Sequence, residues 1–286
     1  MDDDGARLGS ARIAFLGPGV MAEAMVSGLI GRAGMAPEQL TLSGPRPERL
    51  EELRLRHGIQ TASDNREAAS QADVVVLSVK PQTLPGVLAE IRGAMAEEAV
   101  GLSIVAGARL NDLAQGTGHA AWVRSMPNTP GQVGAGITVW TATPQALPDQ
   151  RAAARGILSA LGQEIFVEDE DYLDMATALS GTGPSYVYLF MEAMVDAGVH
   201  LGFPRRIAEQ LVVQTVKGSV AYYEHSPSHL ARLRNQVTSP GGTSAAALYY
   251  LEKAGFRTAL SRAIWAAYER SVQLGSGKRR GQVTDD

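Results

Sequence analysis

A turn-forming segment stands directly before a helix-prone run at residues 245–251, and it reads Val237-Thr238-Ser239-Pro240-Gly241-Gly242-Thr243-Ser244. Pro240 fixes its own φ, the two glycines permit backbone conformations that other residues rarely adopt, and Thr243 or Ser244 can cap the following helix. Free N–H groups at a helix start, together with two hydroxyls, attract an anion without any charged side chain. The segment therefore predicts a pocket for a small carboxylate, and a solvent-exposed capped turn is the alternative.

A glycine-rich turn near the chain start is the second candidate site. Residues 11–16 predict a buried strand, which is followed by Gly17-Pro18-Gly19-Val20-Met21-Ala22. Between a first strand and a helix, such a turn is the usual cradle for the pyrophosphate of a dinucleotide. Pro18 has no N–H to offer a phosphate, but its fixed φ suits the entry to a helix. We expect a dinucleotide here, with a plain tight turn as the alternative.

The residues after the second strand distinguish NAD from NADP, because an acid at that point would bind the ribose hydroxyls of NAD. This chain has Ser43-Gly44-Pro45-Arg46 at that point, without an acid. A hydroxyl and a guanidinium suit a phosphate, so the sequence favours NADPH as the cofactor, with NADH as the second candidate. The alternative is an ordinary turn in which Arg46 is solvated.

Another strand ends in Leu77-Ser78-Val79-Lys80-Pro81. Ligands of open α/β sheets bind at the carboxyl ends of the strands, so Lys80 could serve the nicotinamide side of the cofactor. A lysine at a strand end is also a common surface residue.

Two kinds of scaffold must position these residues. After the strand at 11–16, short apolar runs predict strands at 40–43, 74–79, 100–105, 121–124, 136–140 and 164–167, with helices between them. This alternation of strands and helices predicts an α/β domain with a doubly wound sheet over residues 1–168. Strand patterns then stop, and an all-α domain is predicted over 169–274, with helices at 184–201, 204–223, 228–236, 244–254 and 256–274. Residues 275–286 have no apolar face and are expected to be a disordered tail.

The helical half is unusually apolar, as in Tyr186-Val187-Tyr188-Leu189-Phe190-Met191. A helix that is apolar on most sides must be covered on most sides. We therefore expect this half to form a homodimer, with a well-packed single bundle as the alternative.

Composition excludes several classes of protein. The 286 residues are 45% apolar and 20% charged, and 26 Lys+Arg against 30 Asp+Glu give a net charge of −4, which argues against nucleic acid or an anionic membrane as partner. Cysteine is absent, so disulfides, thiolate metal sites and a cysteine nucleophile are excluded. No apolar run approaches about 20 residues, and the start Met1-Asp2-Asp3-Asp4 lacks the basic residues of a signal peptide, so we expect a cytoplasmic protein.

The motifs taken together resemble the pyrroline-5-carboxylate reductase family over nearly the whole chain. The match includes the generic segment Phe15 to Ala22 and the short motif Val79-Lys80-Pro81. The highly specific part comprises Arg124-Ser125-Met126-Pro127-Asn128-Thr129-Pro130, Leu179-Ser180-Gly181-Thr182-Gly183-Pro184-Ser185-Tyr186, Gly202-Phe203-Pro204-Arg205 and the opening segment through Ser244. The resemblance implies a Rossmann domain followed by a helical dimerisation domain, with dimers often assembled into decamers. It also implies an active site shared across the dimer, in which the loop from Ser239 to Ser244 closes over the nicotinamide of the partner subunit.

Functional residues carry over by position from this resemblance. Substrate contacts carry over to Glu170, Thr243 and Ser244. The predicted carboxylate pocket adds Ser239, Gly241 and Gly242 as substrate-binding residues. Cofactor contacts are expected, together with Arg46, at Leu16, Gly17, Pro18, Gly19, Val20, Met21, Ser43, Asn65, Ser78, Val79, Lys80, Pro81, Ile104, Val105, Ala106 and Asn128, with Gln236 a weaker candidate. The family commonly has threonine where this chain has Ser244, which keeps the hydroxyl and lacks the methyl group that restricts its rotamer.

The implied reaction adds a hydride from the nicotinamide to the imine carbon of a five-membered cyclic imine that bears a carboxylate, giving L-proline. An iminium is already electrophilic, so the protein has to supply orientation, a carboxylate pocket and a hydrogen-bond partner for the ring nitrogen. Ser244, with Thr243 beside it, is predicted as that partner, and Glu170 is predicted to favour the protonated ring. This chemistry agrees with the lack of a His–carboxylate or Ser–His arrangement near any motif.

Two alternatives remain. A close one is a related reductase that acts on a six-membered cyclic imine or on a 3-hydroxy acid; a 3-hydroxy acid dehydrogenase would need a lysine at the start of the helical half, and none stands between Asp169 and Gln214. The other belongs to a different class and is a non-catalytic NADP-binding sensor or scaffold on the same fold. No metal site is expected, since Pro227 separates His225 from His229.

Overall fold

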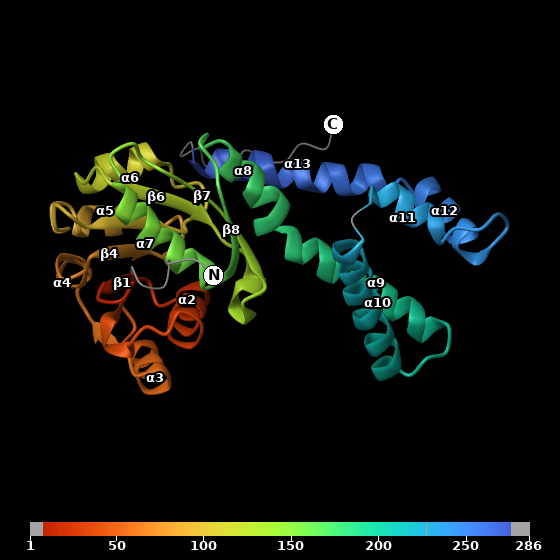
Figure 1. The fold of residues 1–286 in the computed structure, drawn as a ribbon, viewed down its shortest axis with the longest axis horizontal. Helices are drawn as coiled ribbons and strands as arrows, with labels where there is room; N and C mark the ends of the chain where they lie inside the picture. Colours follow the sequence, from red (N-terminus) through yellow and green to blue (C-terminus); the bar gives the residue numbers. More distant parts are fainter. Residues whose placement is uncertain (1–7, 227, 276–286) are drawn as a thin grey trace. The chain divides into compact units, whose positions relative to one another are not determined.

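The computed structural model describes residues 8–226 and 228–275, which form two compact units. The first unit joins residues 8–182 with the end of the chain from 267, and the second contains residues 183–266. The first is an α/β unit, and every regular element of the second is a helix in the part of it that is described (Figure 1). The predicted tail lies outside the described residues, apart from Gly275.

An eight-stranded sheet forms the centre of the α/β unit, in the order β3-β2-β1-β4-β5-β6-β7-β8. The strands are β1 (Ile13–Leu16), β2 (Leu40–Ser43), β3 (Gln60–Ala62), β4 (Val74–Leu77), β5 (Val100–Ser103), β6 (Trp122–Met126), β7 (Gly136–Ala142) and β8 (Gly162–Phe166). β1 to β6 are parallel, β7 is antiparallel to β6, and β8 is parallel to β7. This is the doubly wound order, extended at one edge by β7 and β8.

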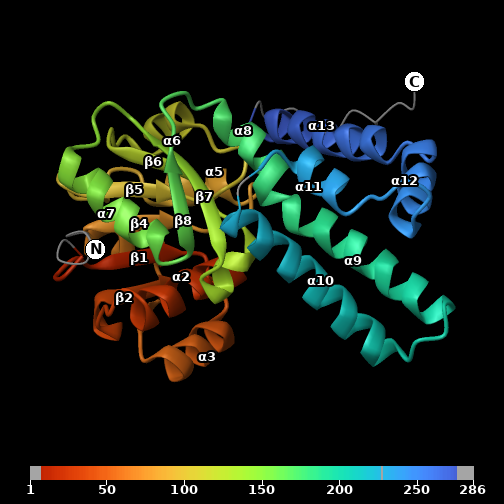
Figure 2. The same cartoon turned by 45° about the vertical axis from the view of Figure 1, so that its right-hand side comes forward.

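Helices cover both faces of the sheet, because alternate residues of each strand point to opposite sides (Figures 1 and 2). Ile13 and Phe15 pack with α2 (Val20–Gly31), α3 (Pro47–His57) and α7 (Pro148–Ser159). Ala14 and Leu16 pack with α4 (Asn65–Ser70), α5 (Leu84–Glu90) and α6 (Leu110–Thr117). Shorter helical turns are η1 (Pro37–Gln39), η2 (Thr129–Val133), α8 (Tyr172–Ala176) and the π-helical η3 (Thr177–Gly181).

The predicted doubly wound sheet and the predicted helical half are confirmed. The sequence did not predict β3, because Gln60-Thr61-Ala62 contains no apolar run. This segment is a strand because its backbone pairs with β2. Nor did it predict the π-helical turn. The domain boundary near Glu168 stays a prediction, and in the structure α8 contacts β6 and β7 of the α/β unit, whereas the helical unit begins at Gly183.

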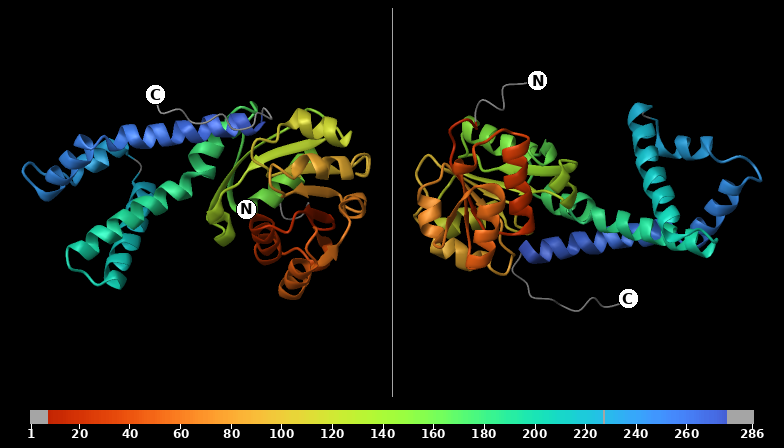
Figure 3. Two further views of the ribbon diagram at one scale, coloured as in Figure 1. Left: turned by 180° about the vertical axis from the view of Figure 1, so that it is seen from behind. Right: turned by 90° about the horizontal axis from the view of Figure 1, so that it is seen from below.

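The helical unit contains α9 (Gly183–His200), α10 (Arg205–His225), α11 (Leu230–Gln236), α12 (Thr243–Lys253) and the first part of α13 (Phe256–Gly275), as the two views of Figure 3 show. α9 and α10 pack closely where Gly198 meets Ala208, and a Cβ at Gly198 would lie 3.0 Å from that of Ala208. Among the described residues of this unit, the buried apolar side chains are Val195, Ala208 and Val212. Leu189 and Tyr250 are 67% and 70% exposed, so most of the apolar surface of these helices is uncovered in a single chain.

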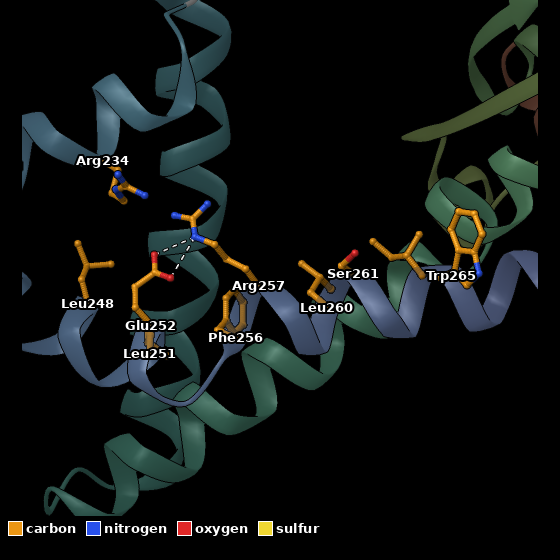
Figure 4. Close-up of a pocket in the computed structure, with 10 residues that line it drawn as sticks. Arg234, Leu248, Leu251, Glu252, Phe256, Arg257, Leu260, Ser261 and Trp265 are labelled. Atoms are coloured by element: carbon orange, nitrogen blue, oxygen red, sulfur yellow. Dashed lines mark hydrogen bonds and ion pairs between the residues drawn. The ribbon is translucent and has the colours of Figure 1, made fainter. Parts of the chain in front are cut away.

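An open apolar hollow lies within the helical unit, between α11, α12 and α13 (Figure 4). Its apolar lining comes from Leu248, Leu251, Phe256, Leu260, Ile264 and Trp265. At one side Arg257 Nε donates to Glu252 Oε1 and Oε2, at 2.8 and 3.1 Å. The hollow is a further part of the surface that a single chain leaves uncovered.

Glu23 provides a test of how α2 is held to α3. Its carboxylate accepts hydrogen bonds from Arg49 and Arg56 and lies 3.3 Å from His57 Nε2. Partial burial raises the pKa of Glu23, but the hydrogen bonds from Arg49, Arg56 and His57 outweigh that effect and hold the pKa below its ordinary value.

We expect Glu23→Gln to lower the free energy of unfolding by about 1 kcal/mol at neutral pH. A lowered pKa stabilises the fold above the ordinary value of about 4.3 and ceases to do so as the pH falls through the lowered value, so the difference from wild type should shrink below about pH 4. Urea denaturation at pH 7, 5 and 3 measures it. Glu51→Gln, which removes an exposed pair with Arg54, is the control with a smaller effect. A difference that is the same at all three pH values would contradict this account.

Candidate functional site

The turn after β1 admits only glycine at its first position. Gly17 has a φ of +108°, and a Cβ there would lie 2.8 Å from both Ser78 O and Val79 Cγ1. The turn is anchored on both sides, since Gly17 N donates to Ser43 O at 2.8 Å and Ser78 N donates to Leu16 O at 3.0 Å. It therefore lies at the carboxyl edge of the sheet between the ends of β2 and β4, where the strand order reverses and where doubly wound folds bind ligands.

The helix that follows this turn starts without a side-chain cap. Gly19 is the N-cap residue of α2, and the first intrahelical bond is donated by Glu23 N to Gly19 O. The N–H groups of the first turn therefore face the carboxyl edge as donors for an anion. Pro18 is buried against Gly44, where a Cβ would lie 2.3 Å from Pro18 Cδ, so the backbone after β2 runs directly beside the turn.

Ser43 does not present its hydroxyl at the surface. Its side chain is fully buried, and Oγ donates to Asn65 Oδ1 at 2.8 Å. Asn65 Nδ2 in turn donates to Glu90 Oε2 at 2.6 Å. The Ser43 hydroxyl, which the sequence offered as a phosphate contact, is therefore engaged within the protein. Arg46, at the N-cap position of α3, is exposed at the same strand end.

The loops after β4 and β5 are tied to the glycine turn and to each other. Ser78 Oγ donates to Leu16 O and Gly17 O, at 3.1 and 2.8 Å. Ile104 N donates to Leu77 O at 3.1 Å, which brings residues 104–106 beside Ser78-Val79. Val105 is buried, whereas Lys80 is exposed. The structure therefore brings the predicted cofactor residues from 16–21, 43–46, 65, 78–81 and 104–106 to one edge of one sheet.

The side-chain amide of Asn128 forms hydrogen bonds with two other segments of the α/β unit. Its Oδ1 accepts from Ile137 N at 3.0 Å, and its Nδ2 donates to Ser180 O at 3.2 Å. Asn128 thereby joins the segment after β6 to the π-helical turn η3. These bonds indicate a structural role for this side chain.

Glu170 lies in the α/β unit, and its carboxylate is already engaged. Glu170 Oε1 accepts from Arg124 Nη1 at 2.8 Å and from Leu110 N at 2.9 Å. Arg124 also donates from Nη2 to Asp174 Oδ1 at 3.1 Å, and Ser271 Oγ donates to the same oxygen at 2.7 Å. Arg124, Asp174 and Ser271 are each 2% exposed. Sequence reasoning missed this cluster, although an arginine inside the apolar strand run Trp122-Val123-Arg124 is a signal of a buried ion pair.

The loop at 239–244 belongs to the helical unit. Gly241 has a φ of +70°, and Gly242 N donates to Ser239 O at 3.0 Å. Gly242 is the N-cap residue of α12, which has no side-chain cap, so the prediction that Thr243 or Ser244 caps the helix is wrong. The extended N-cap conformation falls one residue earlier, which places both hydroxyls inside the first turn. Thr243 is exposed and Ser244 is half-buried.

Two family models match different parts of the chain. A family model described as pyrroline-5-carboxylate reductase dimerisation matches residues 170–274, and one described as NADP oxidoreductase, coenzyme F420-dependent, matches residues 12–107. No helix among the described residues has the length and hydropathy needed to span a membrane.

Several relatives that match over nearly the whole chain are pyrroline-5-carboxylate reductases. The pyrroline-5-carboxylate reductase of Synechocystis sp. is 42% identical, with 93% of this chain and 99% of that protein covered. That of Arabidopsis thaliana is 34% identical over 93% of this chain and 96% of its own length. Among solved structures, the Plasmodium falciparum pyrroline carboxylate reductase with NADP bound has a TM-score of 0.86 at 32% identity, covering 93% of this chain and 98% of that chain.

The glycine turn, the uncapped start of α2 and the paired loops after β4 and β5 fit a nicotinamide dinucleotide, and the near full-length matches connect this site to one reaction. That reaction is the NAD(P)H-dependent reduction of L-1-pyrroline-5-carboxylate to L-proline, the last step of proline biosynthesis. The chain belongs to the pyrroline-5-carboxylate reductase family.

Proposed function

We propose that the active site of this reductase is assembled from two subunits: the carboxyl edge of the sheet in one chain and the loop at 239–244 in its partner. The uncovered apolar surface of the helical unit supports a homodimer, because such helices need a partner to bury them. The separation of the two sets of site residues into different compact units supports the sharing. The domain division at 168/169, the further assembly of dimers into decamers and a cytoplasmic location are parts of the same proposal. The domain division rests on the end of the strand patterns, the cytoplasmic location on the composition, and the decamer on the family resemblance.

The proposed cofactor is NADPH, with Arg46 as the residue that recognises its extra phosphate. Arg46 is exposed at the end of β2, and no acid stands at residues 43–46 to repel a phosphate. Gly44 is buried against Pro18 at the same point, which places the backbone after β2 beside the glycine turn. When bound, the cofactor supplies a hydride to the imine carbon of the substrate.

The proposed substrate site uses the start of α12. The N–H groups of Thr243 and Ser244 lie in the first turn, where no side chain satisfies them, and they suit the carboxylate of the substrate. The Ser244 hydroxyl would donate to or accept from the ring nitrogen, and Thr243 would border the same carboxylate. Ser239 and the two glycines shape the approach, since a Cβ at Gly242 would lie 2.5 Å from Ser239 Oγ. Glu170, predicted to favour the protonated ring, is engaged by Arg124 and Leu110 and fits a different role.

The NADPH proposal is tested by Arg46→Met. Loss of a charge-assisted contact to the phosphate should raise KM for NADPH roughly tenfold or more and leave KM for NADH nearly unchanged. Steady-state kinetics with each cofactor at saturating substrate measure both values. Arg54→Met, on the exposed face of the same helix, is the matched control. Equal changes in KM for NADPH and for NADH would show that Arg46 does not bind the extra phosphate.

The loop proposal is tested by Ser244→Ala and Gly242→Val. Removing one aimed hydrogen bond should lower kcat/KM for the imine by roughly tenfold to a thousandfold. Valine at 242 should abolish turnover, because its side chain would collide with Ser239 and displace the start of α12. Ser70→Ala, which removes an exposed hydroxyl on α4, is the control. Full activity in both loop variants, with cofactor binding intact, would rule out this site.

A further inference from the structure

We infer that Arg124 is a positioning residue for the reaction: acting through Glu170, it holds the loop between β5 and α6, residues 104–109, in the shape that receives the cofactor. The inference rests on the proposed assignment of residues 104–106 to the cofactor. It gives Glu170 a role in the α/β unit in place of a contact with the substrate ring.

The buried charge of Arg124 fixes the position of Glu170. Arg124 is 2% exposed on β6, so its guanidinium requires close carboxylate partners. It finds them in Glu170, at 2.8 Å, and Asp174, at 3.1 Å. Because both acceptors belong to the short segment around α8, the ion pairs attach that segment to the sheet.

Glu170, held by Arg124, in turn fixes the end of the loop through a hydrogen bond. The oxygen that pairs with Arg124 also accepts from the N–H of Leu110, the first residue of α6, at 2.9 Å. The N-cap residue Arg109 supplies no side-chain cap, and Glu170 accepts from one of the N–H groups that the first turn of α6 leaves without an intrahelical partner. Arg109 Nη2 binds the same segment, at 3.0 Å from Asp171 Oδ1. The end of the loop is thus held by residues 170–174.

The remainder of the loop is held from two other sides. Its start is fixed by Ile104 N, which donates to Leu77 O at 3.1 Å. Its middle packs against the end of α13, since a Cβ at Gly107 would lie 2.8 Å from Gly275 N. Ser271 of α13 donates to Asp174 at 2.7 Å, so the helix that backs the loop is bonded to one of the two carboxylates that pair with Arg124.

This arrangement separates two roles for Glu170. A carboxylate that positions the loop should affect cofactor binding, even without substrate. A carboxylate that stabilises the protonated ring should affect turnover of the imine and leave cofactor binding unchanged. The nicotinamide cofactor can be titrated alone, so the two roles have different signatures.

The test compares Arg124→Met, Arg124→Lys and Glu170→Gln with wild type, using NADPH titration monitored by protein fluorescence and steady-state kinetics with the imine. We expect Arg124→Met to raise both Kd and KM for NADPH at least about tenfold, while KM for the imine changes less than about twofold. Lysine keeps the charge and should restore part of the affinity. Glu170→Gln retains an acceptor for Leu110 N–H and should weaken NADPH binding less than Arg124→Met. Arg12→Met, which breaks an exposed pair with Asp73 at the amino edge of the sheet, is the control.

Two results would overturn the inference. In the first, Glu170→Gln lowers kcat with the NADPH Kd unchanged, which would place Glu170 at the substrate. In the second, the folded fraction of each Arg124 variant binds NADPH as wild type does, which would limit Arg124 to stability. If Arg124→Met does not fold, Arg124→Lys and Glu170→Gln still decide the question. Failure of wild-type protein to reduce the imine would count against the proposed active site, whereas the titration tests the inference separately.

Discussion

The helices of residues 183–266 present more apolar surface than they can bury against one another, and that surface is free for association with another chain. Only three apolar side chains of the described part of this unit are buried, at Val195, Ala208 and Val212. The apolar hollow beside Arg257 and Glu252 is open in the single chain. Burial of apolar surface is the main favourable term in folding and association, so the unit forms a homo-oligomer.

The α/β unit is organised differently, because its sheet is covered by helices on both faces within one chain. Its binding edge needs no partner to form. Gly17 turns where the strand order reverses, and backbone bonds to Ser43 and Ser78 hold that turn between two neighbouring strand ends. The chain therefore combines a self-sufficient cofactor edge with a helical unit that requires association. The loop at 239–244 belongs to the second of these units, so in the proposed assembly association is a condition of activity.

Local patterns carried most of what could be predicted from the sequence. The turn at Gly17 and the loop at Gly242 are contiguous segments whose residue types restrict the backbone directly. Side-chain direction is set by contacts far apart in the chain and was not predictable: the Ser43 hydroxyl turns inward to Asn65, and Glu170 pairs with Arg124, 46 residues away. The bond from Ser271 to Asp174 spans 97 residues, so no local pattern signals it. The N-cap of α12 was predicted at Thr243 or Ser244 and lies at Gly242, so the start of this helix was misplaced by only one or two residues.

Subunit complementation tests the central claim, that each site takes its cofactor edge from one chain and its loop from another. Gly17→Val removes the cofactor turn and Gly242→Val removes the loop, so each homodimer should be inactive. After co-expression, or unfolding and refolding of an equal mixture, each heterodimer should contain one intact shared site. We predict recovery of about one quarter of wild-type activity, since half of the dimers are mixed and each has one working site of two. If mixed dimers form, as shown by differently tagged subunits, and no activity returns, the site lies within a single chain and the account is wrong.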